Sequence, residues 1–516
     1  MTKPAALDLD GLTLAEVRTG ALRDRPVTVL GLARSGIALA RFFADAGARV
    51  TVYDGRSEGE LTEAVAALGS RNVRLMLGPE VEPATTWADA ALVATSPSIT
   101  PDFPTTEPRL RVALRTLVDV RAGGDPTVPA LVSEADLFLR LCPAPTVGVT
   151  GTKGKTTTSS LTAAILAADV AHPVVLGGNI GQPLIETLTE LTPGHRVVDE
   201  LSELQLPTLS RGTTVAVYTN VTADHLDRHG TLEAYRAVKR RLAEMVPDDG
   251  ALVLNAEDPV VAAYEARPGV RRVTYRRSRP VAGGLGVVDG WIVAAAVPAL
   301  ADVDGPGGQV TDGRIMPVAD LAIPGAHNIS NALAAIAAGI LFGVEPERIR
   351  AAASGFTGVE HRLESVATID GVRFVNDSQG TQPDAVAAAL RAFDAPIVLI
   401  AGGRAKGIDV SVLAPVVADR AWAAVLIGES GPDLEAEFRA AGLTRTEQAP
   451  DLETAVIRAD AIAREARGAS GAETATVLLS PAAASFDMFV DYAARGRAFK
   501  SAVARLVAAH DGGGTR

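Results

Sequence analysis

One segment constrains the fold of this chain more than any other, the stretch from Val147 to Ser160 that reads VGVTGTKGKTTTSS. Its apolar start has the character of a buried strand, two glycines allow a tight turn, and a lysine then leads into a run of threonines. A strand that turns through glycines into a helix is typical of nucleotide-binding loops, because the amides at the helix N-terminus attract phosphate. The segment therefore predicts an α/β sheet that carries a phosphate loop.

The common form of this loop is G-x-x-x-x-G-K-[ST]. This chain departs from it at one position, because residue 149 is Val where the pattern requires Gly. Gly151 instead starts a shorter loop that reads G-T-K-G-K-T. We expect Lys155 to contact the β- and γ-phosphates of ATP and Thr156 to bind magnesium. A Gly-Lys turn without a ligand is the alternative, and the threonine-rich helix start argues against it. The predicted ATP-binding loop comprises Gly151, Thr152, Lys153, Gly154, Lys155, Thr156 and Thr157.

Composition limits the classes of partner. Hydrophobic residues make up 47% of the chain and charged residues 21%, as in globular proteins. The formal net charge of −12 argues against a broad nucleic-acid-binding face, so we expect no nucleic-acid partner. A few Lys and Arg residues are still enough for a local phosphate pocket.

The sequence also predicts a cytoplasmic location. The longest apolar segment, residues 332–344, is too short to span a bilayer, and the N-terminus does not read as a signal peptide. A single cysteine, Cys142, excludes a disulfide framework and a cysteine-based zinc site.

A chain of 516 residues is too long for one hydrophobic core, and its pattern predicts three α/β domains. Residues 1–132 read as strand, tight turn, helix and strand, which predicts a Rossmann-like domain. Residues 133–355 form a central ATPase domain of the mononucleotide-binding type with a parallel sheet. Residues 356–516 contain three further apolar strands, which predict a second Rossmann-like domain. We read residues 280–318 as a β-rich insertion or flap.

The N-terminal turn allows a different class of function. The stretch GLARSG, followed by Asp54, resembles a dinucleotide-binding fingerprint, but Ala33 replaces its middle glycine. A nicotinamide-dependent oxidoreductase therefore remains an alternative. Such a protein would bind NAD(H) and show no metal-dependent ATP turnover.

Four further stretches, taken with the phosphate loop, resemble the Mur ligase superfamily, which joins amino acids to cell-wall or folate precursors. They read ELSELQL, TNVTADHLDRHGTLEAYRAVK, IPGAHNISNALAA and EHRLE...VNDSQGT, in this order. The resemblance covers nearly the whole chain. The N-terminal GLARSGIA and the C-terminal LSPAAASFDMFVDYAARGRAF are similar to the branch that adds glutamate to UDP-N-acetylmuramoyl-L-alanine.

This resemblance implies an ATP-dependent amide ligase that adds D-glutamate through an acyl-phosphate intermediate. The reaction belongs to peptidoglycan precursor synthesis, and so to cell wall biogenesis, cell shape, cell division and the cell cycle. The implied catalytic residues are Lys155, Glu200, His225 and Lys239, and the implied ligands of two magnesium ions are Thr156, Glu200, His225 and Lys239 as a carbamate. Read without the resemblance, Glu200 also fits a solvated turn, and Lys239 a helix surface.

The same resemblance assigns the UDP substrate to the domain of residues 1–132, and glutamate and nucleotide to the domain of residues 356–516. It also implies the substrate contacts. For ATP they include Asn328, Arg362 and Asp377, although Asn328 also fits a simple helix cap. For the UDP substrate they are Leu32, Ala33, Arg34, Ser35, Asp54, Arg56, Ser96 and Asn179. For glutamate they are Thr381, Lys406, Ser485 and Phe486.

The chain departs from the family pattern at three places. Glu203 and Leu204 stand where the family usually has Ser and an aromatic residue, so Glu203 either adds negative charge near the reacting centre or points away. Gln379 stands where a lysine is usual beside the glutamate pocket, and Lys153 stands where the phosphate loop usually has Asn. These changes leave open whether D- or L-glutamate is the substrate.

Other members of the superfamily are competing readings. A sister ligase for another amino acid remains possible, as does a folyl-polyglutamate synthase, although the separate N-terminal domain counts against the latter. A catalytically inactive nucleotide-binding regulator is disfavoured by the joint presence of Lys155, Glu200, His225 and Lys239. We expect a monomer without a membrane span, whose third domain closes to assemble the site.

Overall fold

The computed structural model describes residues 6–125, 127–224, 226–300, 310–323, 325–404 and 410–513. The predicted site residues His225 and Lys406 lie outside these ranges. The chain divides into two compact units, Met1–Phe356 and Thr357–Arg516. Each unit is described by itself, and the boundaries of the three predicted domains remain a prediction.

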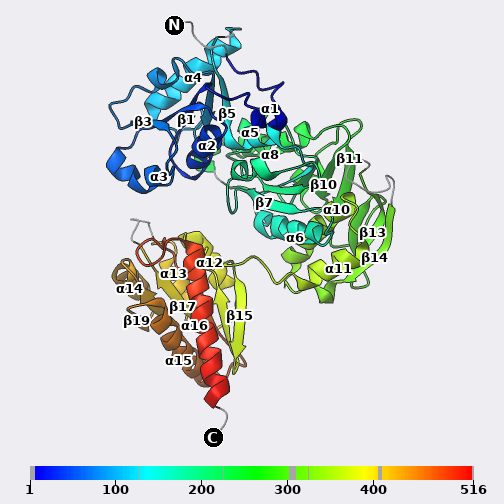
Figure 1. Ribbon diagram of the computed structural model, residues 1–516. Helices are drawn as coiled ribbons and strands as arrows, with labels where there is room; N and C mark the ends of the chain where they lie inside the picture. The colour runs from blue at the N-terminus through cyan, green and yellow to red at the C-terminus, as the bar shows by residue number, and fades with distance from the viewer. Residues whose placement is uncertain are drawn as a thin grey trace. The chain divides into compact units, whose positions relative to one another are not determined.

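The first sheet of the N-terminal unit is parallel throughout and has the strand order β3-β2-β1-β4-β5 (Figure 1). This is the Rossmann-like arrangement that the strand-turn-helix-strand pattern predicted, and the chain reverses direction across the sheet between β1 and β4. Its strands are β1 Pro26–Leu30, β2 Arg49–Asp54, β3 Val73–Leu77, β4 Leu92–Thr95 and β5 Ala130–Ser133. Its helices are α1 Leu14–Arg18, α2 Arg34–Asp45, α3 Thr62–Ala66 and α4 Pro108–Ala122, with short 3-10 turns η1 Glu58–Leu61 and η2 Pro83–Trp87.

The second sheet has nine strands in the order β14-β13-β12-β11-β10-β9-β6-β8-β7. All pairs from β7 to β12 are parallel, whereas β12, β13 and β14 pair antiparallel. The strands are β6 Thr146–Thr150, β7 Val174–Gly178, β8 Arg196–Glu200, β9 Val215–Tyr218, β10 Ala251–Asn255, β11 Arg271–Tyr275, β12 Gly284–Val288, β13 Trp291–Pro298 and β14 Val310–Pro317. The helices are α5 Glu134–Leu141, α6 Lys155–Ala167, α7 Leu226–His229, α8 Leu232–Met245, α9 Pro259–Ala262, α10 Ala326–Leu341 and α11 Pro346–Gly355, with 3-10 turns η3 Leu184–Glu186, η4 Leu188–Glu190, η5 Leu206–Thr208 and η6 Val318–Asp320.

The central sheet is mixed, because an antiparallel edge of β12, β13 and β14 adjoins the predicted parallel strands. The β-rich stretch 280–318 is an extension of the sheet and not a separate flap, as far as its described residues go. Only two residues, Asp289 and Gly290, connect β12 to β13. Because a parallel connection needs a crossover of a dozen or more residues, so short a turn can only join antiparallel strands.

Burial explains why residues 1–356 form one unit. The central strands β6, β8, β9 and β10 are buried at every position, as expected for parallel strands covered on both faces. Helices α6 and α10 pack together over one hydrophobic cluster. A second cluster runs without interruption from the first sheet, through α5 and η3, to the other face of the central sheet.

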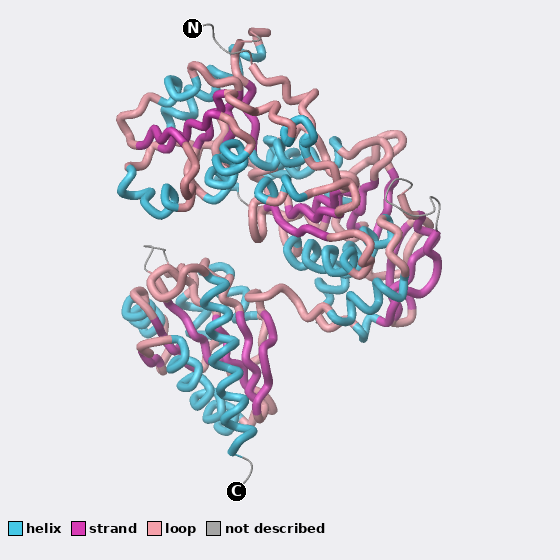
Figure 2. The backbone as a smooth tube through the Cα atoms, viewed as in Figure 1, coloured by secondary structure: helices cyan, strands magenta, loops and turns pink. Residues whose placement is uncertain are grey.

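The C-terminal unit is a six-stranded sheet in the order β15-β16-β20-β17-β18-β19, antiparallel only between β15 and β16. Two clusters, one under α15 and α16 and the other under α12, α13 and α14, cover its two faces; Figure 2 shows strands between helices in this unit. The strands are β15 Glu364–Ile369, β16 Val372–Asn376, β17 Ile397–Gly402, β18 Ala423–Ile427, β19 Thr446–Gln448 and β20 Ala475–Leu479. The helices are α12 Pro383–Arg391, α13 Ala414–Arg420, α14 Gly431–Ala440, α15 Leu452–Ser470 and α16 Tyr492–Gly513.

The predicted α/β class, with three sheets, is confirmed. No helix within the described residues combines the length and the apolar character needed to cross a bilayer.

Candidate active site

The phosphate loop lies between β6, which ends at Thr150, and α6, which begins at Lys155. Gly154 caps the helix with a left-handed φ of 84°. A Cβ atom at this position would lie 2.5 Å from Oδ1 of Asn331 in α10. Both the backbone conformation and the close approach of α10 therefore require glycine here.

The residues that follow β9 hold the loop in place. The amide of Thr152 donates to the carbonyl of Asn220 (2.8 Å), and the amide of Lys153 donates to Oδ1 of the same residue (2.9 Å). The Thr152 hydroxyl lies 2.9 Å from the hydroxyl of Tyr235 in α8. The loop conformation is therefore fixed by its own protein contacts, so a nucleotide would meet a preformed cradle.

The loop side chains divide into buried and exposed ones. Lys155 Nζ donates to the carbonyls of Gly151 and Thr152, each at 3.0 Å, so it folds back over the loop. Thr156 is buried at the first turn of α6 and Thr157 is half-buried. The Lys153 side chain is exposed, so this departure from the family pattern faces solvent.

Lys239 is a buried residue of α8 and not a helix-surface lysine. Its side chain is 0% exposed, and Nζ donates to the Gly151 carbonyl (3.1 Å) and to the Thr150 hydroxyl (3.3 Å). Burial and the nearby charge of Lys155 lower the pKa of Lys239 to about 7. A large share of the amine is therefore neutral at physiological pH.

Glu200 ends β8 beside the phosphate loop, because β8 pairs with β6 in parallel register. It is buried, which excludes a solvated turn residue. Its Oε1 accepts a hydrogen bond from Asn179 Nδ2 (2.8 Å). Its Oε2 is buried and has no hydrogen-bond partner among the described residues. An unpaired carboxylate oxygen in the interior is costly unless a cation or donor satisfies it.

The structure settles the position of Glu203. Its carboxylate is buried and accepts a hydrogen bond from Arg228 Nη1 in α7 at 2.8 Å. Its negative charge also acts on Lys239, whose pKa it raises against the larger effect of burial. Glu203 therefore lies beside the reacting region, where Arg228 balances its charge.

The predicted UDP-binding turn follows β1 at the carboxyl edge of the first sheet. Asp54 organises it, since its Oδ2 accepts from the Leu32 amide (2.8 Å) and from Arg56 Nη2 (2.9 Å). Burial opposes ionisation of Asp54, but the hydrogen bonds from Arg56 and Leu32 outweigh it and lower its pKa. Ala33 and Arg34 are exposed at the N-terminus of α2.

The other predicted UDP contacts lie nearby or on the central domain. Ser35 is half-buried in the first turn of α2, and Ser96 follows β4, the neighbour of β1, with its hydroxyl 3.1 Å from that of Ser98. Arg34 Nη1 donates to the Gly181 carbonyl (2.9 Å), two residues after Asn179. The turn of the first sheet and the Asn179 loop are therefore joined directly.

Asn328 does not cap α10. The helix begins at Ala326 after Gly325, whose position has no side-chain cap, so Asn328 lies within the first turn. Its Oδ1 accepts from Asn331 Nδ2 (3.0 Å), and Asn331 Oδ1 in turn accepts from the Thr158 hydroxyl (3.3 Å). The two asparagines connect α10 to the helix of the phosphate loop.

In the C-terminal unit, Asp377 follows β16 and is buried. Its two oxygens accept from the Ser480 hydroxyl (2.6 Å) and from the Leu363 amide (3.2 Å). Burial raises the pKa of Asp377 to about 6. Arg362 is exposed between His361 and Leu363, which both have left-handed φ values of 65° and 45°. Such backbone strain is common at ligand sites.

The residues predicted to bind glutamate, as far as the structure describes them, lie on two loops of this unit. Thr381 is half-buried after β16, Ser485 is buried after β20, and Phe486 is 57% exposed. Gln379, which replaces the usual lysine, has a buried Oε1 with no hydrogen-bond partner among the described residues.

Comparison with known proteins decides the family. The models for the Mur ligase middle domain and for the Mur ligase, glutamate ligase domain match residues 149–339 and 361–483. A protein of Symbiobacterium thermophilum named UDP-N-acetylmuramoylalanine--D-glutamate ligase is 39% identical over 93% of this chain and 97% of its own length. The chain belongs to the Mur ligase family. A protein of Pelotomaculum thermopropionicum with the same name is 38% identical to this Mur ligase over 93% of this chain and 98% of its own length.

The fold of this Mur ligase also resembles a solved one. The crystal structure of UDP-N-acetylmuramate-alanine ligase MurC from Thermotoga maritima superposes with a TM-score of 0.52 at 19% identity, covering 94% of this chain and 99% of that chain. At this identity the likeness concerns the fold alone.

Mur ligases use ATP and Mg²⁺, and the residues of this Mur ligase fit both. The glycine-capped start of α6 suits a phosphate. The unsatisfied Oε2 of Glu200 is a hard oxygen donor of the kind that Mg²⁺ prefers. The hydroxyl of Thr156 lies in the first turn of the same helix.

Sequence reasoning missed several residues of this Mur ligase. Asn331 and Tyr235 carried a usable signal, since they are spaced three and four residues from Asn328 and Lys239 and so share a helix face with them. The pair of Glu203 with Arg228 carried none, because its members are far apart in the sequence.

Proposed function

We propose that this chain catalyses the reaction for which its relatives are named, the ATP-dependent addition of D-glutamate to UDP-N-acetylmuramoyl-L-alanine, known as the MurD reaction. The product is a precursor of peptidoglycan. The chain acts in the cytoplasm as a monomer. One observation carries the proposal: Lys155, Lys239 and Glu200 gather at the phosphate loop, two of them fully buried.

The chemistry needs a carboxylate made electrophilic. A carboxylate oxygen of the acceptor's L-alanine attacks the γ-phosphorus of ATP, and the bond to the β-phosphate oxygen breaks to release ADP. The amine of glutamate then attacks the carbonyl carbon of the acyl phosphate. The carbon–oxygen bond breaks, inorganic phosphate leaves, and the amine loses a proton as the amide forms.

The role of the phosphate loop is to bind and orient ATP. Lys155 neutralises charge on the γ-phosphate, which phosphoryl transfer generally requires. By the family resemblance, the loop from Gly151 to Thr157 binds the phosphates, as does Arg362. Asn328 contacts the adenine and Asp377 the ribose. Magnesium, when bound, supplies further charge neutralisation for phosphate and carboxylate oxygens. Thr156 and Glu200 would hold it, and His225 would join a second magnesium site.

Lys239 completes the metal site as a carbamate. A neutral amine attacks the carbon of CO₂, a nitrogen–carbon bond forms and a proton is released, which converts a cation into an anionic oxygen ligand. Two observations support this modification. The amine is buried against the loop, and its pKa of about 7 makes the reactive neutral form available.

The remaining predicted residues select the two substrates. The turn from Leu32 to Ser35, with Asp54, Arg56, Ser96 and Asn179, binds the UDP-sugar acceptor. Thr381, Lys406, Ser485 and Phe486 bind glutamate. Hydroxyl and cationic donors suit carboxylate recognition.

The test is phosphate release with ATP, Mg²⁺ and UDP-N-acetylmuramoyl-L-alanine, with D- and L-glutamate offered in parallel. We expect release that depends on the acceptor and on D-glutamate, and loss of it in Lys155→Ala. Release with L-glutamate alone would overturn the assigned enantiomer and make Gln379 a candidate determinant. Turnover without the acceptor, or near-normal turnover of Lys155→Ala, would contradict the proposal itself.

A further inference from the structure

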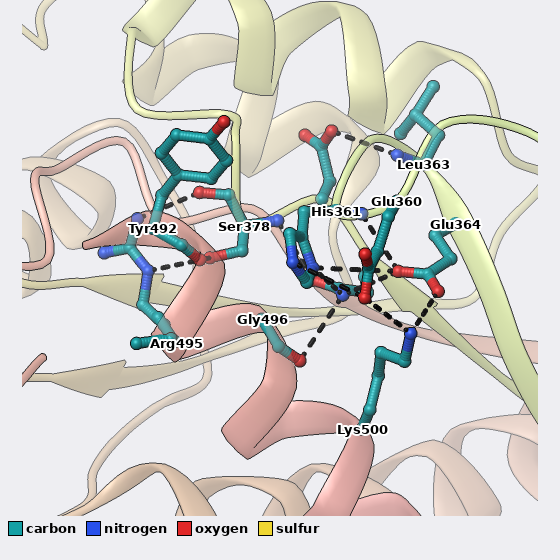
Figure 3. Close-up of polar contacts among 12 residues, drawn as sticks. Glu360, His361, Leu363, Glu364, Ser378, Tyr492, Arg495, Gly496 and Lys500 are labelled. Atoms are coloured by element: carbon teal, nitrogen blue, oxygen red, sulfur yellow. Dashed lines mark hydrogen bonds and ion pairs between the residues drawn. The ribbon is translucent and has the colours of Figure 1, made fainter. Parts of the chain in front are cut away.

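The first turns of α16 contact both loops that carry the residues predicted to bind glutamate. Arg495 is 1% exposed. Its Nε donates to the Ser378 hydroxyl and its Nη2 to the Ser378 carbonyl, each at 3.0 Å, while Nη1 donates to the Ala483 carbonyl at 3.1 Å. The Ser378 hydroxyl donates in turn to the Tyr492 carbonyl (2.7 Å). Figure 3 shows Arg495, Ser378 and Tyr492 in this arrangement.

Arg495 carries a buried charge that has no carboxylate in direct contact among the described residues. Its three hydrogen-bond acceptors are neutral oxygens. The carboxylate of Asp487 acts on Arg495 without such contact and raises its pKa, against the larger effect of burial. Burial lowers the pKa of Arg495 to about 10, so the guanidinium stays protonated at neutral pH. Buried cations are normally paired. Because no direct ion pair cancels its charge, the guanidinium gives the two loops that it contacts a positive potential, which favours an anion beside them.

The two loops that Arg495 contacts are the ones proposed to bind glutamate. Ser378 comes directly before Gln379 and three residues before Thr381, and Ala483 comes two residues before Ser485. Gln379 has lost the positive charge that the family usually has at that position. Arg495 contacts the same loop through Ser378, so it keeps a positive charge close to the residues proposed to bind glutamate.

Lys500, one turn along α16, offers a contrast. Its Nζ donates to Glu364 (2.7 Å) and to Glu360 (3.0 Å), so its charge is balanced. Glu364 also accepts from the amide of His361 (2.9 Å), and these contacts hold the segment that bears Arg362. Between the two cations, Gly496 lets this segment approach the helix, because a Cβ there would collide with the His361 ring. One helix thus supports two sites through different side chains (Figure 3).

We propose that Arg495 is a positioning and specificity-determining residue for the anionic amino-acid substrate: it locks the loop at residues 378–381 to the loop at residues 483–486 and keeps a buried positive charge behind them. Lys500 positions the segment proposed to bind the nucleotide, through its contacts with Glu360 and Glu364. This inference rests on the proposed function, since it takes glutamate as the ligand of these loops.

The experiment compares KM values in the full-length protein for glutamate, ATP and the UDP-sugar acceptor. Arg495→Met removes both the three hydrogen bonds of the guanidinium and its positive charge. We expect KM for glutamate to rise at least tenfold while KM for ATP stays within twofold. Arg495→Lys keeps the charge but not the guanidinium's hydrogen bonds, so its KM for glutamate should lie between those of the wild type and Arg495→Met. Lys500→Met is the matched variant on the same helix, and we expect it to raise KM for ATP and leave KM for glutamate within twofold.

An unchanged KM for glutamate in Arg495→Met would overturn the inference. It would also be overturned if Arg495→Met and Lys500→Met each raised KM for glutamate and KM for ATP by the same factor. If Arg495→Met does not fold, Ser378→Ala provides the test, because it removes one acceptor and leaves the guanidinium in place. KM for glutamate should then rise severalfold with the melting temperature little changed, and no rise would contradict the inference.

The outcome is separable from failure of the proposed function. Wild-type phosphate release that does not depend on glutamate would refute the function alone. Amide hydrogen exchange of residues 376–381 and 480–486 still reports on the two loops in that case. Faster exchange of both loops in Arg495→Lys would support the lock, and unchanged exchange would refute it.

Discussion

Lys239 lies in the interior, where an ammonium group loses hydration that a carbonyl and a hydroxyl replace only in part. The depressed pKa follows from that environment, and it gives the residue a nucleophilic amine near neutral pH. Its neighbour Arg240 has the opposite setting. Arg240 is exposed and pairs with Glu244 one turn along α8 (2.8 Å). The two adjacent positions therefore form a natural comparison.

We expect Lys239→Ala to lower kcat by about 10²-fold or more, because it removes a charged group from the reacting centre. Short carboxylic acids should restore part of the activity by occupying the space of the carbamate. Arg240→Ala should stay within about twofold of wild type. Steady-state phosphate release, with and without acetate or formate, measures all three, and full activity of unrescued Lys239→Ala would refute the assignment.

At the scale of elements, α5 joins the first sheet to the central one. Its first residue, Glu134, is buried and accepts a hydrogen bond from the amide of Ile185 in η3 (3.2 Å). Burial raises the pKa of Glu134 to about 7. The folded state therefore keeps this proton at pH values where the unfolded chain has released it. The contribution of Glu134 to stability is full below about pH 4.5 and is lost as pH rises through 7.

We expect Glu134→Gln to raise the melting temperature at pH 8, since the amide keeps an acceptor for Ile185 and cannot ionise. The rise of the Glu134 pKa from 4.5 to about 7 corresponds to a gain of up to about 3 kcal/mol. The gain should shrink as pH falls from 8 to 5. Thermal unfolding of both proteins across this range measures it, and a constant difference would show that Glu134 does not titrate as proposed.

At the scale of the whole molecule, the hydrophobic core divides where the chain does. Each of the five clusters formed by the described residues lies within a single unit, three before Thr357 and two after it. The C-terminal unit has a sheet covered on both faces, which is what an independent domain of this size needs.

We therefore expect residues 357–516 to fold when expressed alone. The isolated unit should melt cooperatively and give dispersed amide resonances. It should have no ligase activity, because the phosphate loop lies in the other unit. Circular dichroism and a two-dimensional NMR spectrum test this, and a non-cooperative melt would show that the unit depends on residues before 357.

Local sequence was enough for the elements whose pattern is local. The strand-glycine-helix order around Gly154 and the alternation of apolar runs predicted three α/β sheets. The sequence indicated β-rich structure at residues 280–318 but not the antiparallel pairing of β12, β13 and β14, because strand direction depends on how a connection pairs in space. The same limit applied to α10, whose start at Ala326 left Asn328 inside the helix.

The sequence by itself determined the fold class, the phosphate loop and the membership of the Mur ligase family, because these depend on residues close together along the chain or on motifs in a fixed order. Only the tertiary structure decided that Lys239 and Glu200 are buried, that Glu203 is paired with Arg228, and that Arg495 spans two loops. Burial and charge pairing depend on which distant segments pack together. The pKa of a side chain, and the ligand it suits, follow from that packing.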